Sequence, residues 1–244
     1  MDEPREAMPT NLEPSVLIRA EPIDAVRCRF LVDRPVDPDR WAYFAGPSAA
    51  LGSPLAERLL AIDGVVAVLI AHNTVTITRT PPAGIPLLGP AMFRLRRLLG
   101  DNRAGADSWP ALGRRVGEAI REHIASGAPA VSEAAHAAMP SEAELADRIR
   151  LALDEQVNPV LAGHGGGVEL VEVRDNVAYL RMGGGCQGCG LADTTLRHGV
   201  EGVLRDLVPE LGAIFDLTDH ASGTSPYYRP GSGTPGRSPL GRRR

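Results

Sequence analysis

The run Gly183–Gly190 constrains the fold of this chain more than any other stretch. Five of its eight residues are glycine, and it holds Cys186 and Cys189, three positions apart. Glycine has no Cβ, so such a run can turn sharply and approach a bulky group closely. An apolar, strand-like run, Val177–Met182, precedes the loop, and a helical pattern begins at Leu191. The pattern predicts two exposed thiolates on a bare loop between a strand and a helix.

Several kinds of site share the C-x-x-C spacing, including iron–sulfur, zinc and dithiol redox sites. A helix N-terminus after the loop would lower the pKa of both thiols, which suits ligation and redox chemistry alike. The flanking glycines favour ligation, because they leave space around the sulfurs. Two alternatives stay open: a thiol–disulfide oxidoreductase, and a zinc-binding interaction module. His164 and His198 could complete a zinc site, but their spacing is a weak pattern.

One chain offers fewer thiols than a cluster needs. A metal or cluster takes about four protein ligands, and the chain has three cysteines. Cys28 lies in another predicted domain, where a small buried thiol fits the core. The economical solution is a homodimer in which each chain gives Cys186 and Cys189 to one shared cluster. On this interpretation, Gly184→Val should weaken the cluster-bound dimer and leave the fold largely intact.

The order of predicted strands and helices indicates a two-domain α/β (α+β) protein, and length and charge fit two domains with no nucleic-acid or membrane partner. A chain of 244 residues has room for about two domains. The net charge of −4 gives no sign of a nucleic-acid binder, and no run approaches the roughly 18 apolar residues of a membrane span. The acidic N-terminus lacks an apolar core, which argues against a targeting segment. The odd number of cysteines fits a reducing, cytoplasmic location.

Changes in composition divide the chain. We expect a first domain over residues 15–127, an Ala/Pro/Ser-rich linker over 128–140 with a solvated His136, and a second domain over 141–220. Residues 221–244 hold five arginines and no acid and are predicted to be a disordered basic tail.

Hydrophobic periodicity predicts the elements of the first domain. They are a strand at Cys28–Val32, a helix capped by Ser53-Pro54, a hairpin turning at His72-Asn73, and a helix from Trp109 to Ser126. A proline-rich insertion, 81–105, separates the hairpin from the last helix, and its role is not assigned.

The second domain is predicted to be a short mixed sheet flanked by two helices, with the C-x-x-C loop between sheet and helix. A capping box, Ser141 to Glu144, starts the first helix, whose buried stripe is Leu145, Ile149, Leu153 and Val157. A hairpin of Val168–Val173 and Val177–Met182 turns at Asp175-Asn176; the second helix reaches Leu207, and Ala213–Leu217 is a final strand.

Residues Val157–Leu217 resemble the C-terminal NifU-like domain of Nfu-type iron–sulfur scaffold and carrier proteins. The motifs are Asn158-Pro159-Val160-Leu161, then His164-Gly165-Gly166-Gly167-Val168-Glu169-Leu170, then Gly183-Gly184-Gly185-Cys186-Gln187-Gly188-Cys189. The resemblance implies that Cys186 and Cys189 bind a cluster, usually [4Fe-4S], bridged between two subunits. It implies a carrier, not an enzyme, with an upstream scaffold and apo iron–sulfur client proteins as partners. Many members have aspartate where this chain has His164, which is therefore not a predicted ligand.

Residues Ile18–Ile124 are similar, more loosely, to the Nfu N-terminal domain. The likeness rests on Glu21-Pro22, Ile62-Asp63-Gly64-Val65 and Trp109, among others. The family's Thr-Pro-Asn-Pro element is absent, since Ile23-Asp24-Ala25-Val26 stands there. A degenerate A-type carrier domain is the alternative ancestor. With either ancestor, this domain lacks ligands of its own and is expected to select partners.

Overall fold

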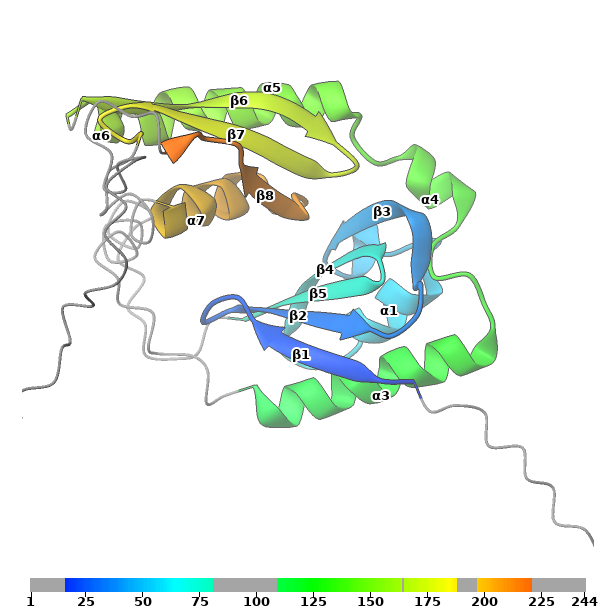
Figure 1. Cartoon of the computed structure of the whole chain (residues 1–244). Coiled ribbons are helices and arrows are strands. Elements are labelled where there is room, and N and C mark those ends of the chain that lie inside the picture. Colours follow the sequence, from blue (N-terminus) through cyan, green and yellow to red (C-terminus); the bar gives the residue numbers. More distant parts are fainter. Residues whose placement is uncertain (1–15, 81–108, 164, 188–196, 221–244) are drawn as a thin grey trace, which may run out of the picture.

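The computed structural model describes residues 16–80, 109–163, 165–187 and 197–220. These residues form two sheets, each with its own hydrophobic core (Figure 1). The helices pack against the sheets and do not alternate regularly with parallel strands, which confirms the predicted α+β class. The insertion at 81–105 and the basic tail at 221–244 lie outside the described residues.

The first sheet has five antiparallel strands in the order β1-β2-β5-β4-β3. The strands are β1 (Ile18–Pro22), β2 (Arg27–Val32), β3 (Asp37–Ala45), β4 (Val65–His72) and β5 (Thr74–Arg79). The β4–β5 hairpin turns at His72, whose φ is 51°, as the sequence predicted. The sequence did not predict β3. Pro38 lies inside β3, and the pairing of β3 with β4 shifts in register between Asp37 and Trp41. The alternation of apolar and polar residues that marks a strand is therefore broken.

Two helices cover one face of this sheet. They are α1 (Pro54–Leu60) and α3 (Pro110–Ser126), with a short 3-10 helix, η1 (Pro47–Ala49), before α1. The Ser53 hydroxyl caps α1 by accepting a hydrogen bond from the Ala56 amide, as predicted. Cys28 and Phe30 on β2 pack in the same core as Ile120 of α3. Of the helices described, none is long and apolar enough to cross a membrane.

The predicted linker packs against the first sheet. It contains α4 (Glu133–Ala137), and Ala130, Val131 and Ala135 are buried in the first core. The prediction of a solvated His136 is wrong: its side chain is 10% exposed, and Nε2 lies 3.2 Å from Oδ2 of Asp37. The small apolar residues that suggested a flexible tether instead allow close packing. The domain boundaries themselves stay predictions.

The second sheet has three strands in the order β6-β7-β8. Its elements are α5 (Glu142–Ala152), a π-helix η3 (Leu153–Val157), α6 (Asn158–Ala162), β6 (Gly166–Arg174), β7 (Val177–Gly184), α7 (Arg197–Leu207) and β8 (Ala213–Asp216). Because β6–β7 is antiparallel and β7–β8 parallel, the sheet is mixed, as predicted. The capping box and the left-handed turn at Asp175-Asn176 are also confirmed.

The helices of the second half pack on one face of this sheet. Val168, Leu180 and Met182 share a core with the predicted stripe of α5 and η3 and with Leu204 of α7. Side chains alternate across a strand, so Glu169 and Arg181 project from the opposite face. The strand β7 runs directly into the cysteine loop, and Cys186 packs in the core on the helix-covered face.

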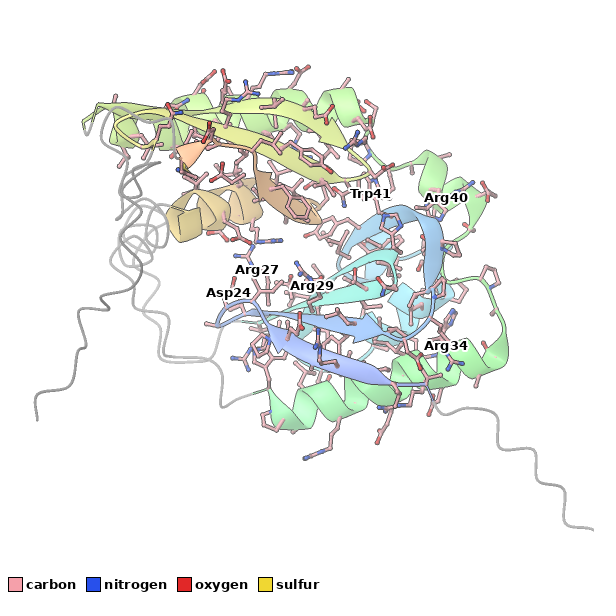
Figure 2. All side chains as sticks on the ribbon, in the orientation of Figure 1. Asp24, Arg27, Arg29, Arg34, Arg40 and Trp41 are labelled. Carbon is pink, nitrogen blue, oxygen red and sulfur yellow. The ribbon has the colours of Figure 1, made fainter. Side chains whose placement is uncertain are left out.

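An ion pair joins the two halves of the chain. Arg27 of β2 is 9% exposed at its side chain and lies 2.8 Å from carboxylates on either side, Asp24 in its own half and Asp206 on α7. Trp41 of β3 also packs against the second core. Figure 2 shows Asp24 and Arg27 on the edge of the first sheet that faces α7. The helix that follows the cysteine loop is therefore linked to the first sheet by the Arg27–Asp206 ion pair.

Candidate metal centre

The cysteine loop begins as a tight turn at the end of β7. Gly184 has a φ of 59°, a left-handed conformation that favours glycine. The turn brings the Cys186 amide to the Gly183 carbonyl oxygen at 3.3 Å and the Gln187 amide to that of Gly184 at 3.1 Å. The chain therefore folds back at once, and Cys186 is placed beneath the open end of the β6–β7 hairpin.

A second glycine loop, which enters β6, packs against the first. Gly165 also has a positive φ, 69°, and its amide donates to the Ala162 carbonyl oxygen at the end of α6. Its own carbonyl oxygen accepts a 2.8 Å hydrogen bond from the Gly185 amide. Gly166 and Gly184 are register partners in the sheet. The two glycine-rich motifs of the sequence thus form one structure in which their backbones are in contact.

The close approach of these loops buries Cys186. Its exposure is 2%, and a Cβ built on Gly166 would lie 2.3 Å from its Sγ. The prediction of an exposed thiolate is therefore wrong for Cys186 in this conformation. The glycines do leave space around the sulfur, as expected, but the backbone of the other loop fills that space.

Asn158 fixes the position of the second loop. Its side-chain amide donates to the Val168 carbonyl oxygen at 3.0 Å and accepts from the Val168 amide at 2.8 Å. The side chain thereby satisfies both backbone groups at the outer edge of β6, as a neighbouring strand would. Reasoning from the sequence did not assign Asn158 a role. Its position in the Asn158-Pro159 motif was the one feature of the sequence that could have suggested one.

The segment after β8 supports the other side of the cysteine loop. The Gln187 side chain donates to the Asp219 carbonyl oxygen at 2.9 Å, and the Thr218 hydroxyl accepts from the Met182 amide at 2.7 Å. Asp216 in turn accepts a hydrogen bond from the Thr218 amide and lies 3.0 Å from Nε2 of His220. The loop is therefore held between the start of β6 and the residues that follow β8.

Among the candidate ligands whose side chains the structure describes, Cys28 and Cys186 lie in separate cores and are not brought together. Cys189 and His164 lie outside the described residues, and so does the side chain of His198. Cys28 lies in the first core, where burial raises the pKa of its thiol to about 11. It is therefore protonated at neutral pH, which fits the predicted structural role and not a ligand.

The donor chemistry of the loop fits an iron–sulfur cluster. Cysteine sulfur is the usual ligand of such clusters. Cys186 provides one such sulfur, and the backbone of Gly166 lies against it. Within the described ranges, no group of three or more His, Cys, Asp or Glu side chains is placed to hold a metal.

The sequence comparisons match the segment that contains the cysteine loop. A family model described as the NifU-like domain matches residues 149–214, which include α6, the β6–β7 hairpin and both glycine loops. Residues 149–214 are therefore similar to the NifU-like domain. The model begins at residue 149, so it does not test the resemblance of residues 18–124 to the Nfu N-terminal domain, and that part stays a prediction.

Curated relatives carry names consistent with this family. The "Fe/S biogenesis protein NfuA" of Pseudomonas aeruginosa is 49% identical over 88 residues, which cover 36% of this chain and 45% of the relative. The protein of the same name from Xanthomonas euvesicatoria is 49% identical over 90 residues, with the same coverages. That of Photorhabdus laumondii is 47% identical over 88 residues, covering 36% and 46%. The chain thus spans about half the length of the curated relatives it matches.

A solved structure is also similar, but too weakly to support an argument. The solution NMR structure of a NifU-like protein from Saccharomyces cerevisiae covers 54% of this chain and 96% of its own, at 12% sequence identity. The TM-score is 0.36. The assignment of the NifU-like domain rests on the sequence match.

Proposed function

We propose that this protein is an iron–sulfur cluster carrier that binds its cargo through Cys186 and Cys189 and delivers it to apo-proteins. The observation that carries the proposal is the match of the NifU-like family model to the segment that contains the C-x-x-C loop. The relatives named as Fe/S biogenesis proteins support it. The thiol of Cys186, which lies against the backbone of Gly166, is a donor of the kind that iron–sulfur clusters take.

The cargo is one [4Fe-4S] cluster shared by two chains. Each chain contributes the two cysteines of its loop, which together supply about four thiolates, the number that such a cluster takes. Cys28 is not counted as a ligand, because it is buried in the first core, away from the cysteine loop. The cluster is cargo, so binding and release are both part of the function.

Delivery is an exchange of ligands. A thiolate of the client replaces Cys186 or Cys189 on iron, the released cysteine becomes a free thiolate, and neither the cluster nor the protein is oxidised or reduced. No bond in a small molecule is made or broken, so the protein acts as a carrier and not as an enzyme. It receives the cluster from an upstream scaffold in the cytoplasm. Because Cys186 is buried, uptake and release require the two glycine loops to separate.

Anaerobic reconstitution with iron and sulfide tests this proposal. We expect a broad brown absorbance and about two iron atoms per chain, because four irons are shared by two chains. Sedimentation should show that the reconstituted protein is a dimer and that chelating the iron returns it to a monomer. A colourless protein that binds zinc, or insulin reduction without iron, would instead support one of the two alternatives.

We also propose that the first half of the chain selects partners. It has its own core and contacts the NifU-like domain through a small set of residues, including the Arg27–Asp206 ion pair. A fragment covering residues 141–220 should therefore bind the cluster but deliver it more slowly than the full chain. Transfer to a purified apo-protein, followed by absorbance, measures the two rates. Equal rates would remove the partner-selecting role.

A further inference from the structure

Residues 158–168 form a lobe whose neck is closed by a single side chain. The lobe runs from Asn158 through α6 and the glycine loop to Val168 in β6, and residue 164 within it lies outside the described residues. At the neck, the Asn158 side-chain nitrogen donates to the Val168 carbonyl oxygen at 3.0 Å, and its Oδ1 accepts from the Val168 amide at 2.8 Å. This pair of hydrogen bonds is called the Asn158 latch below.

The tip of the lobe, residues 165–167, is the part that covers Cys186. A Cβ on Gly166 would collide with the Cys186 Sγ, so the backbone of the tip is in contact with the thiol. The tip meets the cysteine loop through the hydrogen bond from the Gly185 amide to the Gly165 carbonyl oxygen, at 2.8 Å, and through the pairing of Gly166 with Gly184. The thiol reaches a cluster only when the tip moves away.

The tip depends on the latch because it has no side chains of its own to pack. Glycine also loses more conformational freedom on ordering than any other residue. Among the described atoms, a Cβ on Gly167 would meet only Oδ1 of Asn158 within 4 Å. Asn158, Gly167 and Val168 all line a groove of about 420 Å³, through which water reaches the latch. Opening the latch therefore exchanges its two hydrogen bonds for bonds to water and leaves no buried group without a partner.

We propose that Asn158 is a positioning residue that sets how strongly the protein itself competes with a cluster for Cys186. With the latch closed, the tip covers the thiol, and with the latch open the thiol is free to bind iron. The glycine tip is the part that moves, because Leu161 of α6 is buried in the second core. The inference rests on the proposed function and deepens it: closure of the latch buries Cys186 again and so favours release of the cargo.

Alkylation of the cluster-free protein with iodoacetamide, followed for each cysteine by mass spectrometry, tests the latch without iron. Asn158→Ala removes both hydrogen bonds and should raise the rate of Cys186 alkylation at least about tenfold. Asn158→Asp keeps the shape of the side chain but cannot donate to the Val168 carbonyl oxygen. It should therefore also raise the rate, because hydrogen bonds and not packing close the neck. Cys28, in the first core, should react at an unchanged rate in both variants.

Ser141→Ala is the matched control for a general loss of stability. It removes the hydroxyl that caps α5, in the same half of the chain but outside the lobe, at a cost comparable to that of losing the latch. The rate of Cys186 alkylation should stay unchanged in this variant. An equal rise in Ser141→Ala and Asn158→Ala would show that Cys186 is reached by unfolding of the whole second half, which overturns the proposal.

Transfer of the cluster from the reconstituted protein to an apo-ferredoxin is the second measurement. Because Cys186 stays on iron more readily when the latch is lost, Asn158→Ala should transfer its cluster several-fold more slowly than the unmodified chain, with the same iron content. Unchanged alkylation, or transfer that is not slowed, would overturn the latch and leave the cluster carrier standing. If the unmodified chain binds no cluster, the proposed function fails and this inference with it, whatever the alkylation rates are.

Discussion

Cys186→Ser and Cys189→Ser are each expected to reduce the iron bound after reconstitution to background. Each change removes half of the thiolates that one chain gives to the cluster, and serine is a poor replacement for a thiolate on iron. Because two chains share the site, one substitution removes two ligands from each dimer. Iron counted per chain, together with the visible absorbance, measures the effect.

Cys28→Ser is the matched control and should leave the iron content unchanged. Its thiol is buried in the first core, away from the cysteine loop, and burial raises its pKa to about 11. The substitution places a hydroxyl in an apolar core, so a small loss of stability is expected. If Cys28→Ser emptied the site and the other two changes did not, the assignment of the ligands would be wrong.

The sequence predicted the parts of the fold that local chemistry determines. Ser53 and Ser141 cap helices as expected, because a hydroxyl at that position satisfies a free amide. The hairpin at Asp175-Asn176 follows from the ease with which these two residues adopt a positive φ. The stripe from Leu145 to Val157 is buried even though the helix changes to a π-helix at Leu153. Each of these signals is contained in a few adjacent residues.

Features that depend on contacts between distant residues were missed. The pattern around Cys186 could not show that Gly166, 20 residues earlier, would cover the sulfur. His136 was predicted to be solvated because its segment looked like a linker, but α4 packs against β3 and brings it to Asp37. Asn158 likewise acts on Val168, on the strand that follows. In each case the partner is determined by the packing of elements, which periodicity does not reveal.

The burial of Cys186 also changes the expected effect of Gly184→Val. The sequence suggested that this change would weaken the dimer and spare the fold. In the structure Gly184 has a φ of 59°, and a Cβ there would lie 2.4 Å from the Gly165 carbonyl oxygen, a backbone atom that cannot move aside easily. Even Gly184→Ala is therefore expected to lower the free energy of unfolding by about 3 kcal/mol, from the strained conformation and the collision together.

Gly183→Ala, one residue earlier, is the matched control. It has no positive φ and a Cβ there would find no atom within 4 Å, so the free energy of unfolding should change by less than about 1 kcal/mol. Denaturant unfolding of the cluster-free proteins compares the two variants. Equal stability would show that the two glycine loops do not pack as described.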